Sequence, residues 1–142
     1  MCIRDSAYVA AHLAGAIAAA LLLLVLWPGH PADLGATVPT IEPARALVAE
    51  IVLTAFLMLV IMSVATDTRA VGAPAALAIA AAVGLAAIAF GPLTGASLNP
   101  ARSLGPALAS AQWEDFWIYL AGPLARTDLE ERDGDRAVRL PA

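Results

Sequence analysis

The chain has 142 residues, of which 61% are hydrophobic and 14% charged, and its formal net charge is −4. A soluble domain carries about 25% charged residues and is about half apolar, so this composition indicates an integral membrane protein. The eight basic residues, all arginine, are outnumbered by twelve acidic ones, which excludes a nucleic-acid-binding surface. The single cysteine, Cys2, excludes an internal disulfide and a metal site built from thiolates.

The first predicted membrane span covers residues 7–27, which contain no formally charged side chain. At about 1.5 Å per residue the segment reaches roughly 31 Å, enough to cross a hydrocarbon core of about 30 Å. Trp27 and Pro28 are typical of a span end, an interfacial aromatic residue followed by a helix stop. His12 lies within this span, and we expect it to be packed and hydrogen-bonded rather than a ligand or a gate.

Two further spans follow a loop at residues 28–43, where four prolines and two glycines oppose regular structure. The second span, residues 44–66, holds one carboxylate, Glu50, and a carboxylate in a span is a functional candidate. The alternative is that Glu50 reaches a membrane interface. After a polar turn, residues 74–90 form the third span, at the short end of what can cross a membrane. Its many alanines and glycines favour close contact with other helices.

A helix start lies within the apolar region that follows the third span. Asn99 is a favoured N-cap and Pro100 a favoured first helical residue, so the pair predicts a helix over residues 100–110. Such a helix reaches roughly 16 Å, about half of a membrane. Because a glycine-containing loop precedes it and apolar segments flank it, we predict a re-entrant segment. Non-helical backbone at membrane depth must pack in protein or line water, which favours a water-filled cavity here.

Asn99 and Arg102 give this half-helix its chemistry. The helix N-terminus carries roughly half a positive charge, and the Asn99 amide group stays free to donate into a cavity. Arg102 has five donors and a fixed charge that would cost about 2.5–3.5 kcal/mol at the centre of a span, which favours a pore mouth. Together they would repel cations and hydrogen-bond small neutral molecules. The alternatives are an ordinary helix start and an arginine that extends towards the headgroups.

A fourth apolar segment, residues 116–125, begins like a membrane span and gives way to a polar tail at residues 126–142. We interpret it as the start of a membrane helix that is not completed. The aromatic residues near the expected span ends are predicted to form an interfacial belt, namely Trp27, Trp113, Trp117 and Tyr119. The arginines of the short loops favour a cytoplasmic position for the N-terminus, residues 67–69 and the tail.

The segment GPLTGASLNPARSLGPAL, residues 91–108, resembles the second of the two Asn-Pro-Ala loops of the aquaporin, or major intrinsic protein, family. The flanking segments resemble the third to sixth helices of that family, in the order 8–27, 44–66, 74–90 and 115–124. The resemblance covers about residues 7–124. It implies an all-α transmembrane, aquaporin-like half-bundle with three full spans, one re-entrant half-helix and the start of a last span. In the family, two inverted repeats each contribute a half-helix that meets the other at the midplane.

The resemblance also implies roles for single residues. The pore-lining motif corresponds to Asn99, Pro100, Ala101 and Arg102, with Arg102 at the narrow constriction, where two further positions correspond to Ala96 and Ala87. Strict water channels of the family usually carry histidine at the Ala87 position, so two alanines imply a wider constriction that also admits glycerol, hydrogen peroxide or ammonia. Ser103 stands where glycerol-conducting relatives typically have aspartate, which leaves the solute open. Glu50 resembles a buried family glutamate that holds the half-helix loop in shape.

The expected function is passive conduction of water and small neutral solutes across a lipid bilayer, without enzymatic activity, cofactor, metal or nucleic-acid partner. A full-length protein of this kind is expected to form a homotetramer in the plasma or inner membrane. Residues 1–6 resemble nothing that precedes the family's third helix, so we expect a leader foreign to the family and a chain that holds half of a channel. A glycerol facilitator of the same family and a non-transporting membrane scaffold are the alternatives.

Overall fold

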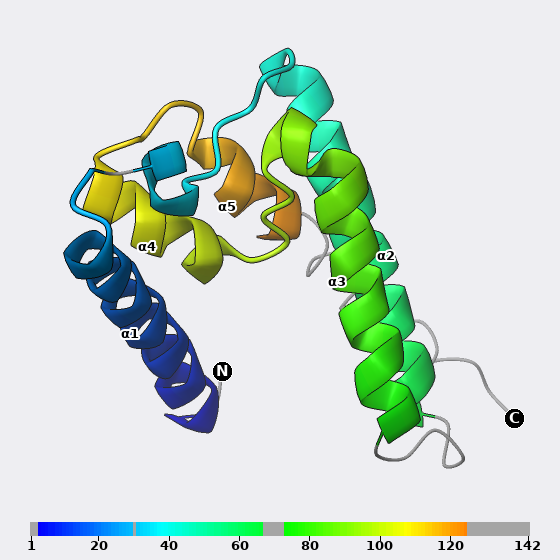
Figure 1. Cartoon of the computed structure of the whole chain (residues 1–142). Coiled ribbons are helices and arrows are strands. Elements are labelled where there is room, and N and C mark those ends of the chain that lie inside the picture. Colours follow the sequence, from blue (N-terminus) through cyan, green and yellow to red (C-terminus); the bar gives the residue numbers. More distant parts are fainter. Residues whose placement is uncertain (1–2, 30, 67–72, 125–142) are drawn as a thin grey trace, which may run out of the picture.

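The computed structural model describes residues 3–29, 31–66 and 73–124, so the turn at 67–69 and the tail at 126–142 lie outside the described residues. This part of the chain is helical and contains no strand, as the sequence predicts. The elements in order are α1 (Ile3–Leu26), the 3-10 helix η1 (Pro31–Gly35), α2 (Pro43–Thr66), α3 (Ala73–Thr94), α4 (Pro100–Ser110) and α5 (Trp117–Leu124). Figure 1 shows α1 on one side, α2 and α3 side by side on the other, and the short helices between them at one end.

Three of these helices are long and apolar enough to cross a membrane, over Ser6–Leu26, Pro43–Val64 and Pro74–Thr94. The prediction of three full spans is therefore confirmed by length and composition. The chain direction alternates from α1 to α2 to α3, so the N-terminal ends of α1 and α3 lie at the same level as the C-terminal end of α2 (Figure 1). This alternation is what successive crossings of one membrane require.

The end of α3 differs from the prediction, because the helix continues from residue 90 to Thr94 through Gly91 and Pro92. The last carbonyl groups of a helix have no donor within the helix and must find one elsewhere. The donors to the carbonyls of residues 91–94 are, in order, Gly95 N at 2.9 Å, the Thr40 hydroxyl at 2.9 Å, Thr40 N at 2.9 Å and the Tyr119 hydroxyl at 2.6 Å. Distant partners therefore stabilise a last turn that the local sequence disfavours.

The long helices present most of their apolar side chains outwards. Within the apolar windows of α1, α2 and α3, only 6%, 17% and 11% of the residues are buried. The most exposed large side chains include Ile88, of which 80% is exposed, and Val25, of which 76% is exposed. Apolar surface of this extent is typical of helices that face lipid or further protein rather than water.

Small residues allow the short helices to approach the long ones closely. A side chain at Gly105 of α4 would come within 2.8 Å of the carbonyl carbon of Ala16 in α1. A side chain at Gly122 of α5 would come within 3.0 Å of Cβ of Glu50 in α2. Close approach through glycine is typical of helix contacts in membranes, where dispersion rather than water exclusion holds helices together.

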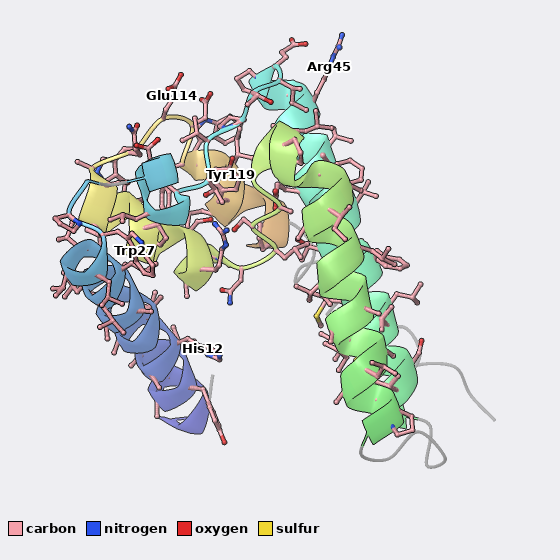
Figure 2. All side chains as sticks on the ribbon, viewed as in Figure 1. His12, Trp27, Arg45, Glu114 and Tyr119 are labelled. Carbon is pink, nitrogen blue, oxygen red and sulfur yellow. The ribbon has the colours of Figure 1, made fainter. Side chains whose placement is uncertain are left out.

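Tyr119 lies in the core and not in the interfacial belt, so that part of the prediction is wrong. It is fully buried with Ile118 against Ala46, in the interior of the short-helix end (Figure 2). The hydrogen bond from its hydroxyl to the Thr94 carbonyl compensates for removing the hydroxyl from water. The three tryptophans of the predicted belt remain about half exposed, with 51% for Trp27, 47% for Trp113 and 49% for Trp117.

The half-helix α4 begins and ends at the predicted residues, Pro100 and Ser110. Asn99 is its N-cap, because the backbone N–H of Ala101 donates to Asn99 Oδ1 at 3.0 Å. The loop at residues 28–43, in contrast, is not without regular structure, since it contains η1. A single 3-10 turn accommodates Pro31 at its first position, where no backbone donor is needed.

Candidate functional site

Glu50, in α2, holds the loop between α3 and α4. Its side chain is fully buried, and Oε1 accepts hydrogen bonds from the Thr94 hydroxyl at 2.8 Å and the Ser97 backbone N–H at 3.1 Å. Its Oε2 accepts from the backbone N–H of Leu98 at 3.1 Å. Hydrogen bonds to a charged group contribute about 1.5–3 kcal/mol each, roughly twice the neutral value. Glu50 therefore makes its hydrogen bonds within the protein rather than with water.

The loop that Glu50 holds has a backbone that most residues avoid. The φ angles of Gly95, Ala96 and Leu98 are 81°, 43° and 58°. The left-handed region costs a residue with a side chain about 1–2 kcal/mol. Besides the bonds to Glu50, the Ala96 backbone N–H donates to the Thr94 hydroxyl at 3.2 Å, which also holds the loop. This conformation persists because the surrounding donors and acceptors fix it, and it brings Asn99 to the start of α4.

Asn99 is the N-cap of α4 and Arg102 lies in its first turn, and both are exposed. Since the Asn99 side-chain oxygen caps the helix, its NH₂ group is the part of the amide that can donate elsewhere. The Arg102 guanidinium donates from Nη1 to the Gly35 carbonyl at 2.9 Å, which directs it towards the end of η1. The positive end of the helix dipole lies at the same turn. The turn therefore concentrates hydrogen-bond donors and positive charge.

A cavity of about 850 Å³ lies beside this turn, between α1, η1 and α4. It brings together three of the predicted site residues, Asn99, Ala101 and Arg102. Much of the remaining wall consists of small or apolar residues from α1, namely Ala11, Gly15, Ala16, Ala19, Ala20 and Leu23. The polar residues of the wall besides Asn99 and Arg102 are Tyr8 and His12 of α1.

Three other predicted site residues are not among those that line the cavity. Pro100 forms the first residue of α4, and Ala96 is buried against Leu53 and Ala86. Ala87 lies on an exposed part of α3. The described residues thus gather the α4 donors around one cavity and leave both predicted alanine positions outside its wall.

His12 lies in the cavity wall and is exposed, so the prediction of a packed histidine is wrong. The expected hydrogen bond is present, because His12 Nδ1 lies 3.1 Å from the carbonyl oxygen of Tyr8 one turn earlier. Figure 2 shows His12 on the side of α1 that faces the rest of the molecule. Among the residues that the structure describes, no group of three or more histidine, cysteine, aspartate or glutamate side chains could hold a metal ion.

A chain of three hydroxyl groups connects the loop after η1 with α4, and the sequence did not predict it. Thr37 donates to Ser103 Oγ at 2.7 Å, and Ser103 Oγ lies 2.6 Å from Ser97 Oγ. All three side chains belong to buried residues. The hydroxyl residues were visible in the sequence, but isolated threonines and serines in loops are too common to indicate a connection across the fold.

The sequence matches the profile of the major intrinsic protein family over residues 1–127. The chain belongs to that family. Nodulin-26 of Glycine max is 48% identical over 122 residues, which cover 86% of this chain and 45% of that protein. Aquaporin NIP1-4 of Oryza sativa subsp. japonica is 44% identical over 122 residues, covering 86% of this chain and 45% of the relative. Aquaporin NIP1-1 of Zea mays is 44% identical over 118 residues, covering 83% of this chain and 42% of the relative.

The chain therefore spans less than half the length of the curated relatives that it matches. Major intrinsic proteins are channels rather than enzymes, and the apolar helices of this member make it a multi-pass integral membrane protein. The first turn of α4 is the part of this major intrinsic protein that lies beside the cavity, and the loop held by Glu50 leads into that turn.

Proposed function

We propose that this chain forms one half of the pore of a passive channel for water and small neutral solutes. The observation that carries the proposal is the shared cavity of Asn99 and Arg102 at the N-terminus of a half-membrane helix. Their donors suit neutral molecules that bear a lone pair, and the fixed charge of Arg102 with the helix dipole disfavours cations.

The test is osmotic swelling of proteoliposomes followed by light scattering. We would compare this chain alone with the chain joined behind the part of nodulin-26 that precedes their matched region. The joined protein is expected to raise water permeability several-fold above empty liposomes. A joined protein that inserts and folds but gives no flux above the lipid background would refute the proposal.

Arg102→Val sharpens this test, with Arg45→Val as the matched control. We expect the Arg102 variant to retain water flux but to admit larger or charged solutes. Arg45 is a suitable control because its side chain is 79% exposed and pairs with Glu42 at 3.3 Å, at the start of α2. Its replacement should leave both water flux and solute exclusion unchanged.

Ala87 and Ala96 belong to the proposal as the two further constriction positions. Two small side chains would widen the constriction and make it less polar, which supports passage of solutes such as glycerol, hydrogen peroxide or ammonia beside water. Ala87→His is expected to lower the ratio of glycerol to water permeability in the joined protein. An unchanged ratio would remove Ala87 from the constriction.

Assembly and location complete the proposal. We propose a homotetramer in the plasma or inner membrane, tested by the mass of the joined protein in detergent and by membrane fractionation. The competing candidate is a non-transporting scaffold, supported by the close helix contact through Gly105. Helix packing without flux in the joined protein would favour the scaffold.

A further inference from the structure

Two adjacent hydrogen bonds join the segment at residues 35–37 to the first turn of α4. Arg102 Nη1 donates to the Gly35 carbonyl at 2.9 Å, and the Thr37 hydroxyl donates to Ser103 Oγ at 2.7 Å. Thr37 is 4% exposed and Ser103 is fully buried, so water competes little for the second bond. Because the acceptors and donors of the two bonds are one residue apart in α4 and two apart in the loop, the Thr37 bond restricts where the Gly35 carbonyl can lie.

The protons of the three hydroxyl groups can be assigned one by one. Thr37 donates to Ser103, and Ser97 donates to the Asn99 carbonyl at 3.0 Å. The proton between Ser103 and Ser97, 2.6 Å apart, then comes from Ser103. Each hydroxyl donates once along a path from the η1 loop to the backbone of Asn99. Loss of the Thr37 hydroxyl would leave Ser103 Oγ without the hydrogen bond that it accepts from Thr37.

Thr37 is also held by packing against Gly95. A side chain at Gly95 would come within 2.8 Å of Thr37 Cγ2 and 3.1 Å of Thr37 Cα. Gly95 also has a φ of 81°, so both the space and the backbone at this position require glycine. The Thr37 methyl group thus fills the space that a side chain at position 95 would need.

We propose that Thr37 is a positioning residue that sets the orientation of the Arg102 guanidinium and thereby the solute exclusion of the pore. It acts through two contacts, the hydroxyl bond to Ser103 and the placement of the Gly35 carbonyl that accepts from Arg102. The functional part of this inference rests on the proposed channel function. The competing explanation is that Thr37 only anchors the loop, as Thr40 does through its bonds to Pro92 and Leu93.

The first experiment measures the reactivity of Arg102 with phenylglyoxal, an arginine-specific reagent, in the full chain in detergent micelles. Mass spectrometry gives the modification rate of Arg102 and, in the same sample, of Arg45 as an internal reference. Thr37→Val is expected to raise the Arg102 rate about fivefold, the equivalent of about 1 kcal/mol for one neutral hydrogen bond at 1.4 kcal/mol per tenfold. Thr37→Ser keeps the hydroxyl and is expected to react like the wild type.

Two further variants separate orientation from loop anchoring. Ser103→Ala removes the bond from Thr37 and also the contact with Ser97, so it should raise the Arg102 rate at least as much as Thr37→Val does. Adding Thr37→Val to Ser103→Ala should change the rate little, because their shared bond is already absent. Thr40→Val should lower the melting temperature without changing the Arg102 rate. An Arg102 rate that Thr37→Val leaves unchanged, or that Thr40→Val raises equally, would overturn the proposal.

The second experiment measures urea and water permeability of the joined protein in proteoliposomes. Thr37→Val is expected to raise the ratio of urea to water permeability, and Thr37→Ser to restore it. An unchanged ratio in a conducting protein would overturn the selectivity role alone. If the wild type shows no flux, the proposed function fails, while the arginine reactivity still decides whether Thr37 orients Arg102.

Discussion

The loop region at residues 91–103 and the three long helices satisfy their backbone hydrogen-bonding groups in different ways. In the long helices, each backbone donor finds its acceptor four residues away, and the side chains are left to meet apolar surroundings. In the loop region the helix is interrupted, and separate partners replace the missing bonds. Glu50 supplies acceptors for two backbone donors, while Thr40 and Tyr119 supply donors for three carbonyls.

The spans and the loop region place different constraints on the sequence. A span needs length and low polarity, so many apolar side chains serve equally at its surface. The loop region needs a given atom at a given place, because a buried polar group without a hydrogen-bond partner costs about 1–3 kcal/mol. Substitutions in the loop region should therefore have large effects, and those on the outer faces of the spans small ones.

Glu50→Gln should have the largest effect of the loop substitutions. The amide keeps one oxygen acceptor but turns an NH₂ group towards Leu98 N–H or Ser97 N–H, where a donor faces a donor. We expect a loss of about 3 kcal/mol, the value for a charged hydrogen bond and an unsatisfied buried donor. Thermal unfolding in detergent micelles, monitored by circular dichroism, measures it.

Glu42→Gln is the matched control for that variant. Glu42 forms an exposed pair with Arg45 at 3.3 Å, and its side chain is 63% exposed. Such a pair contributes about 0–1 kcal/mol, so the melting temperature should hardly change. Equal shifts for both glutamates would contradict the anchoring role of Glu50.

Gly105→Ala tests the contact that seats the half-helix on α1. The added methyl group would lie 2.8 Å from the Ala16 carbonyl carbon, so one helix must shift. Overpacking of this kind costs about 1–3 kcal/mol, and we expect about 2 kcal/mol from thermal unfolding. Gly84→Ala is the control, because a side chain there meets nothing within 4 Å and alanine favours helix. A neutral Gly105 variant would show that α1 and α4 are not closely packed.

What the sequence predicted well was encoded locally. The spans follow from uninterrupted apolar runs whose length matches a membrane, and the start of α4 follows from adjacent capping residues, Asn99 and Pro100. Both signals lie within one segment of chain, so no tertiary information was needed. The placement of Asn99 and Arg102 beside one cavity followed from the same helix, since one is its N-cap and the other lies in its first turn.

What the sequence did not predict depends on distant partners. The bond between Thr37 and Ser103 joins residues 66 apart, and the bond between Tyr119 and Thr94 joins residues 25 apart. Tyrosine is a residue type typical of membrane interfaces, and the Thr94 carbonyl gives its hydroxyl a partner that makes burial possible. The same bond, with those from Thr40, lets α3 continue beyond Gly91 and Pro92, so the two differences from the prediction share a distant partner.

Tyr119→Phe tests the contribution of the Tyr119 hydroxyl to stability, and its expected effect is smaller than that of the glutamate and glycine variants. The variant keeps the buried ring and removes only the hydroxyl that donates to the Thr94 carbonyl at 2.6 Å. Loss of one neutral hydrogen bond should lower stability by about 1 kcal/mol. Tyr8→Phe, at a residue that is 63% exposed, is the control and should leave the melting temperature unchanged. A Tyr119 variant as stable as the control would mean that the carbonyl is satisfied without it.

Ile88→Ala tests the outer face of a span and should change the stability least. Ile88 is 80% exposed on α3, so in micelles its side chain passes from one apolar environment to another on unfolding. We expect a change within about 0.5 kcal/mol, as for surface substitutions elsewhere. Ile118→Ala, at a fully buried residue, should instead cost about 2–5 kcal/mol through the cavity that it leaves. If the two variants were equally destabilising, protein rather than lipid or detergent would cover Ile88, and the face of α3 would belong to an interface.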